Sequence, residues 1–99
     1  MVEAQALTLT TLILHLRAQL LDALYQPATP ENRAVLAGLW RICLTIHDLA
    51  EVRQNRVYVK LMERMVDAIG DYDQIDQPEA MNWEVQLPTV QEIEEASRA

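Results

Sequence analysis

The side chains best suited to chemistry gather in the middle of the chain, around His47. His47 and Glu51 are four residues apart, so on a helix they would project from the same face, as two ligands of one metal ion do. A metal site needs further ligands, and His15 is the only other histidine, so we expect no metal site. Cys43 also lies one turn from His47, the spacing of a thiol and its general base. Because Cys43 falls on an apolar stripe, we predict a buried thiol instead.

Arg41 and His47 suggest a second kind of chemistry. Five residues separate them, and this spacing resembles the arginine–histidine signature of HEPN-type helical ribonucleases. The resemblance implies an RNA-cleaving site in which Arg41 and His47 act on the phosphate and the 2′-hydroxyl. Ile42 follows Arg41, where that family commonly has a polar residue, and the two side chains would lie about a third of a turn apart around a helix. A HEPN-like ribonuclease is therefore the alternative function.

Other elements of catalysis are scarce. Gly38 and Gly70 are the only glycines, which leaves no glycine-rich loop to hold a phosphate. The only serine, Ser97, follows an acidic stretch near the C-terminus. Carboxylate pairs such as Glu92 and Glu95 have nothing nearby to raise a pKa for acid–base work. We predict that the protein is not an enzyme and uses no cofactor.

The charge of the chain is concentrated at its C-terminal end. Residues 1–70 contain seven basic and seven acidic residues, whereas residues 71–99 contain eight acidic residues and one basic residue. The formal net charge of −7 therefore comes from this end. An anionic segment is repelled by nucleic acid and by anionic membranes, so we expect a basic protein surface as its partner. A segment that only improves solubility is the simpler alternative.

Length and composition predict one small all-α protein. The chain has 99 residues, of which 51% are apolar and none is phenylalanine, a composition that favours helices. We divide it into a helical bundle domain, residues 1–70, and an acidic extended tail, residues 71–99. The acidic start of the chain does not match a signal peptide, and polar residues interrupt the apolar stretch 7–24. We therefore expect a cytoplasmic protein with no membrane span.

Apolar residues recur at helical spacing over residues 5–25 and again over residues 30–69. Thr29 and Pro30 form a typical helix start between them, and Gly70 is the predicted C-cap. The polar segment 51–56 contains neither Gly nor Pro. We favour a turn there, which gives a three-helix bundle. Without a turn, a long helical hairpin would result and would have to dimerise.

Residues 81–87 alternate apolar and polar side chains, a pattern that predicts an extended strand. The sequence offers no second strand to pair with it. The segment would fold back as a strap on the helices, add to a sheet edge or groove of a partner, or pair with itself across a dimer axis. Residues 90–96 would form a short acidic helix or stay frayed.

These features favour a non-enzymatic protein–protein interaction module: an adaptor, assembly factor or inhibitor that engages a basic surface through its acidic C-terminal segment. Trp83 would anchor the contact, because buried Trp dominates interface energetics. The predicted partner-binding residues are Met81, Trp83, Val85, Leu87, Glu84, Asp73 and Asp76. A structural subunit of a larger complex is a further alternative.

A homodimer is predicted from apolar residues that lie off the main helical stripes. Leu7, Leu14 and Leu21 recur at intervals of seven residues and give the first helix a second apolar face. Trp40 and Leu44 lie beside the main stripe of the second helix. Apolar faces of this kind need a neighbour, so we assign these five residues to the dimer interface.

Overall fold

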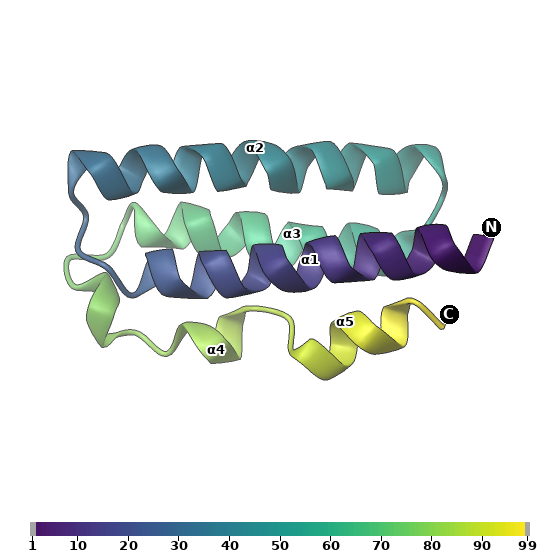
Figure 1. Ribbon diagram of the computed structural model, residues 1–99. Helices are drawn as coiled ribbons and strands as arrows, with labels where there is room; N and C mark the ends of the chain where they lie inside the picture. The colour runs from purple at the N-terminus through teal and green to yellow at the C-terminus, as the bar shows by residue number, and fades with distance from the viewer. Residues whose placement is uncertain (1, 99) are drawn as a thin grey trace.

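The computed structural model describes the backbone of residues 2–98 and the side chains of residues 9–98. Its elements, in chain order, are α1 (Val2–Leu24), α2 (Pro30–Val52), α3 (Arg56–Tyr72), the 3-10 turn η1 (Pro78–Ala80), α4 (Trp83–Gln86) and α5 (Val90–Ala96). Three long helices lie side by side, and α4 and α5 run along their length next to α1 (Figure 1). The described residues contain no strand, which confirms the all-α prediction.

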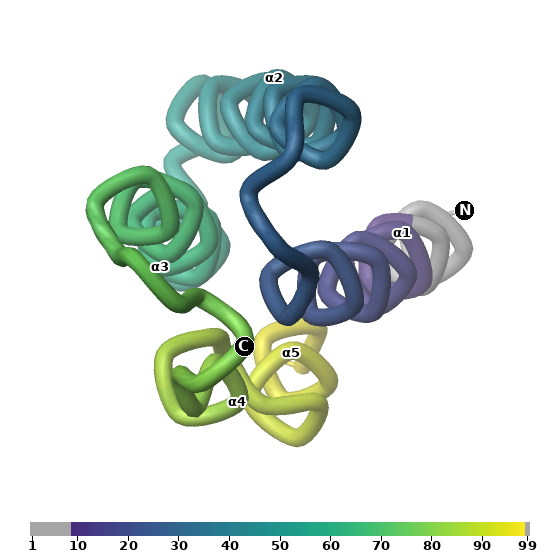
Figure 2. The backbone as a smooth tube through the Cα atoms, turned by 90° about the vertical axis from the view of Figure 1, so that its left-hand side faces the viewer, coloured from purple at the N-terminus to yellow at the C-terminus, as the bar shows by residue number. Residues whose placement is uncertain are grey.

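The core has four sides, and the C-terminal segment, residues 73–98, provides one of them. Figure 2 shows α1, α2 and α3 around three sides of a common centre, with α4 and α5 on the fourth. The buried side chains form a single cluster to which every α-helix contributes. Its fully buried members include Ile13, Leu20, Leu24, Cys43, Met62, Met65, Trp83, Leu87 and Ile93.

The connection between α1 and α2 forms as predicted and is tied to the end of α3. The side chain of Thr29 accepts a hydrogen bond from the backbone N–H of Asn32, and Pro30 occupies the first helical turn. The Asn32 amide donates to Ala23 O and to the Tyr72 hydroxyl, each at 2.9 Å. Tyr72 in turn donates to Gln26 O at 2.8 Å. This small network fixes where α3 ends relative to the first loop.

The chain also turns between α2 and α3, as favoured from the sequence, so the two segments do not form the single long helix of the hairpin alternative. Gln54 adopts a left-handed conformation with φ of 59°. Its N–H donates to Glu51 O, and the N–H of Asn55 donates to Ala50 O, the pattern of a Schellman C-cap. Asn55 then caps α3, since its side chain accepts from Tyr58 N. A capping Asn and a left-handed Gln replace the Gly or Pro that usually marks a turn.

Two sequence predictions about the C-terminal part are wrong. Gly70 lies inside α3, which continues to Tyr72, instead of ending the helix. Residues 81–87 form the short helix α4 with its flanks instead of an extended strand. The apolar residues Trp83 and Leu87 are four apart, so one helical turn buries both, and Val85, the residue that alternation would also bury, is 73% exposed. With no strand to pair with among the described residues, the backbone satisfies its hydrogen bonds locally.

Trp83 is the main anchor of the C-terminal segment. Its side chain is fully buried, and its indole N–H donates to Pro78 O at 2.7 Å. Its backbone N–H donates to the hydroxyl of Tyr25 at 3.2 Å, and its ring lies 6.3 Å from the ring of Tyr72. Trp83 therefore joins the segment to α1 and to the end of α3.

We expect Gln54→Gly to raise the free energy of unfolding by about 0.5–1 kcal/mol, because glycine adopts positive φ without the steric cost of a side chain. Urea unfolding followed by circular dichroism measures this change. Arg53→Gly is the matched control: Arg53 has φ of −84°, so the same substitution there should destabilise the protein. A loss of stability in Gln54→Gly would contradict the strained turn.

We expect Trp83→Ala to lower the free energy of unfolding by roughly 3–5 kcal/mol, as for other buried aromatic truncations. Trp83→Phe keeps most of the volume but leaves Pro78 O without its donor, which costs about 1–3 kcal/mol. Val85→Ala, at an exposed position of the same helix, should change stability by less than about 0.5 kcal/mol. Equal effects at positions 83 and 85 would show that the segment is not packed on the core.

Candidate functional site

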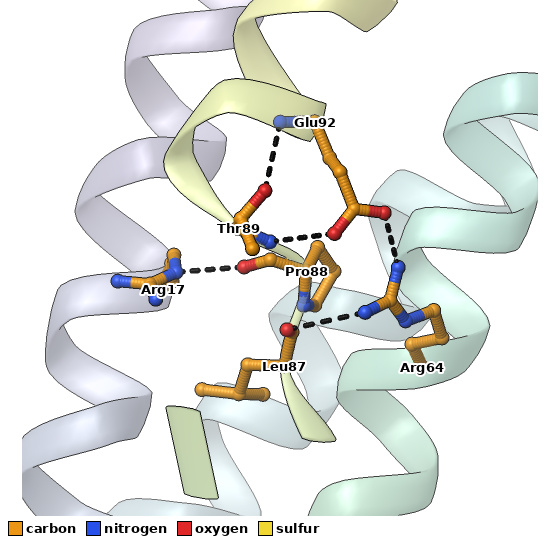
Figure 3. A network of polar contacts seen from close by, with 6 residues as sticks. All are labelled: Arg17, Arg64, Leu87, Pro88, Thr89 and Glu92. Atoms are coloured by element: carbon orange, nitrogen blue, oxygen red, sulfur yellow. Dashed lines mark hydrogen bonds and ion pairs between the residues drawn. The ribbon is translucent and has the colours of Figure 1, made fainter. Parts of the chain in front are cut away.

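Two arginines hold the C-terminal segment where α4 ends and α5 begins. The Nε of Arg17 on α1 donates to Pro88 O at 2.7 Å, and a guanidinium N–H of Arg64 on α3 donates to Leu87 O at 3.2 Å. Figure 3 shows both side chains reaching the connection from opposite sides. Leu87 and Pro88 lie between the two helices, and buried carbonyls outside a helix need a hydrogen-bond donor. The two arginines supply these donors and bind the segment to two helices of the body.

Glu92 completes this network. Thr89 and Glu92 form a capping box at the start of α5, in which each side chain accepts from the backbone N–H of the other residue (Figure 3). The carboxylate of Glu92 also accepts from Arg64, which forms an ion pair with it. The hydrogen bond from Arg64, with the backbone N–H of Thr89, lowers the pKa of Glu92 below its ordinary value of 4.5. One carboxylate thus organises both the helix start and its contact with α3.

The other carboxylates of this region point away from the core. We call them the C-terminal carboxylates: Asp71, Asp73, Asp76, Glu79, Glu84, Glu94 and Glu95, all of which are exposed. Asp73 lies 3.6 Å from Arg33 of α2 in an exposed ion pair, and Arg98 is the only basic residue of the segment. The segment is therefore apolar toward the core and anionic toward solvent. This anionic surface is the candidate functional site.

The structure divides the predicted partner-binding residues into two groups. Trp83 and Leu87 are fully buried and Met81 packs partly buried against the core, so these three contact the chain's own helices. Val85 is 73% exposed, and Glu84, Asp73 and Asp76 are exposed as well. Only this second group is available to a partner.

The predicted dimer residues are also dispersed. Leu14 and Leu21 pack partly buried against the core, Leu44 is partly buried, and the side chain of Leu7 lies outside the described residues. Trp40 is 41% exposed beside an open pocket of about 430 Å³ between α2 and α3. The four residues whose side chains the structure describes are divided between α1 and α2.

The residues around His47 form an acidic group on the α2–α3 side. His47 is 3.6 Å from Asp48, 3.4 Å from Glu51 and 4.0 Å from Glu63. This setting repels RNA phosphate, so it does not favour the ribonuclease interpretation, in which His47 would act with the exposed Arg41. Among the residues that the structure describes, no group of His, Cys, Asp or Glu side chains has an arrangement that could hold a metal ion.

Cys43 is the buried thiol that its apolar stripe predicts. Its side chain has no exposed surface, and burial raises the pKa of the thiol to about 12. A thiol in this state is neutral at physiological pH and is a poor nucleophile. The close sequence spacing of Cys43 and His47 therefore does not create a reactive pair.

Comparison with protein-family models gave no match, and comparisons with curated proteins and with solved structures gave none either. In the described part of the chain, no helix combines the length and the apolar content that crossing a membrane requires.

Sequence reasoning missed the residues that position the segment. Arg17 and Arg64 gave no signal of their own, since each looks like an ordinary polar residue beside an apolar stripe. Thr89 and Glu92, by contrast, have the spacing of a capping box and could have been recognised. That motif would have favoured the short helix over the frayed end, the two alternatives left open for residues 90–96.

Glu92 should make the stability of the protein depend on pH. Its folded pKa lies below its unfolded value, so it stabilises the folded state at pH above about 4.5, and this contribution is lost as pH falls through the folded pKa. Urea unfolding of wild type and Glu92→Gln should therefore give a stability difference that is constant near neutral pH and shrinks below about pH 4.5. The effect is small, because the Glu92 side chain is 42% exposed.

Glu94→Gln, which removes the same charge from the same helix without touching Arg64, is the control. Its stability difference from wild type should vary less with pH. Identical pH profiles for the two variants would contradict a special role of the Arg64–Glu92 pair.

Proposed function

We propose that the protein is a non-enzymatic interaction module that binds a basic surface of another protein through its C-terminal carboxylates. The observation that supports this most directly is the two-sided construction of residues 73–98. Buried Trp83, Leu87 and Ile93 fix the inner side, while carboxylates line the outer side. Because the body, residues 1–70, is electrically balanced, this segment sets the sign of the protein's long-range field.

Anchoring improves such a binding surface in a specific way. A free acidic arm would lose conformational entropy when it is ordered on a partner. Here Arg17, Arg64 and Trp83 already hold the backbone of the segment in place. Much of the conformational entropy is therefore lost when the protein folds, not when it binds a partner. The charges can steer a basic partner toward a surface whose shape is already formed.

Two exposed apolar side chains among the carboxylates would add contact area. Val85 is 73% exposed on α4, and Val90 is 45% exposed at the start of α5. Glu84 directly precedes Val85, and Glu92 follows Val90 by two residues. A partner with basic residues around a small apolar centre would complement this arrangement, since charges supply rate and specificity while apolar contact supplies affinity.

The test begins with affinity capture on the immobilised wild-type protein from lysate of its source cells, followed by purification of the retained partner. We expect the triple variant Asp76→Asn, Glu79→Gln and Glu84→Gln to weaken binding of that partner at least about tenfold by isothermal titration calorimetry, since each lost charge contributes a fraction of the affinity. Raising the salt concentration should weaken wild-type binding in the same direction.

The matched control removes three exposed carboxylates from the body: Asp22→Asn, Glu51→Gln and Asp67→Asn. It has the same net charge as the first triple variant, so net charge alone predicts equal weakening. Our proposal predicts near wild-type binding for the control. Equal binding by both variants, or a wild-type protein that retains no partner, would disprove the proposed function.

A further inference from the structure

A second apolar surface lies on α2, outside the core. Val35, Ile42 and Leu49 recur at intervals of seven residues and are 52%, 42% and 43% exposed. Val52 extends the row and is 80% exposed. We call this row, with the exposed positions Gly38 and Thr45 between its members, the α2 stripe. Apolar residues at a seven-residue repeat along an exposed helix face are the pattern by which one helix packs on another.

Gly38 leaves open space on the stripe. A Cβ added at this position would meet no atom within 4 Å in the described part of the chain. A second helix could therefore approach α2 closely at Gly38, because glycine has no side chain to keep it away.

The charges beside the stripe favour another copy of this chain as the partner. Arg41 and Asp48 are both exposed and flank the same edge of the stripe, one heptad apart. If a second α2 packs antiparallel on the first, Arg41 of each copy lies next to Asp48 of the other, because residues at the same heptad position meet along one edge of an antiparallel pair. The two-fold axis generates this opposite-charge pair twice.

The same register matches the apolar residues. Val35 would face Val52 of the second copy, Ile42 would face Thr45, and Gly38 would face Leu49, whose side chain would fill the space that the glycine leaves. Thr45 fits this setting because its hydroxyl already donates to Arg41 O at 2.9 Å, so burying it leaves no unsatisfied donor.

We infer that the protein forms an antiparallel homodimer through the α2 stripe. The surface differs from the dimer interface predicted from sequence and is independent of the proposed partner binding. Figure 2 shows α2 on the opposite side of the core from α4 and α5, so a dimer of this kind leaves the C-terminal carboxylates uncovered.

Sedimentation equilibrium of the wild-type protein should give a dimer with a dissociation constant in roughly the micromolar range, as expected for a small interface. Ile42→Glu places an unpaired charge in the apolar layers and should raise that constant at least about 100-fold. Val85→Glu makes the same change at an exposed residue away from the stripe and should leave the constant unchanged. Circular dichroism melting of each variant verifies that the monomer remains folded.

A charge exchange tests the antiparallel register. Arg41→Glu and Asp48→Arg each turn two attractive pairs into repulsive ones, and each should weaken the dimer about tenfold. The double variant restores opposite charges across the axis and should return the constant to within about threefold of wild type.

Three results would overturn the inference. The first is a wild-type protein that stays monomeric up to about 1 mM, a range in which specific dimers associate. The second is a dimer that tolerates Ile42→Glu but is lost on Trp40→Ala, which would assign the contact to the pocket side of α2. The third is a double charge variant no tighter than its single variants, which would exclude the antiparallel pairing of Arg41 with Asp48.

Discussion

The fold depends on closing the fourth side of a core that α1, α2 and α3 leave open. Trp83 is the largest of the fully buried side chains that do this, and its indole N–H finds its acceptor, Pro78 O, within its own segment. The ring can therefore be buried without drawing a polar group from the body. The body supplies the two arginines that satisfy the carbonyls of Leu87 and Pro88, and the Tyr25 hydroxyl that accepts from the backbone N–H of Trp83. Apolar burial provides the affinity of the segment for the body, and these hydrogen bonds determine its position.

That arrangement explains where the charge of the protein lies. A segment with one buried side must place its carboxylates on the other, since an unpaired buried carboxylate is costly. Glu92 differs from the other carboxylates: it points toward α3, where Arg64 forms an ion pair with it. The anionic surface is therefore a consequence of docking an acidic segment, and docking also holds its charges in fixed relative positions.

Much of the fold could be predicted from sequence, because apolar spacing and local caps determine it. The helices followed from runs such as Ile13, Leu16 and Leu20, and the first turn followed from Thr29 and Pro30. The strand prediction failed because residues 81–87 fit two patterns. Their alternation fits a strand, while the spacing of Trp83 and Leu87 fits one turn of helix. Only the tertiary contacts of Trp83 with Tyr25 and Tyr72 decide for the helix. For the same reason sequence identified Trp83 as an anchor but could not show that it anchors the chain to itself.

The two proposed surfaces could be used at the same time. Figure 2 shows α2 on the opposite side of the core from α4 and α5, so pairing through α2 would leave both anionic surfaces of the dimer uncovered. Two linked copies bind a partner with two basic patches more tightly than one copy does, provided that the spacing allows both contacts. Like charges on the two surfaces also repel less when they are far apart. Self-association through α2, as proposed, would thus keep the anionic surfaces both separated and accessible.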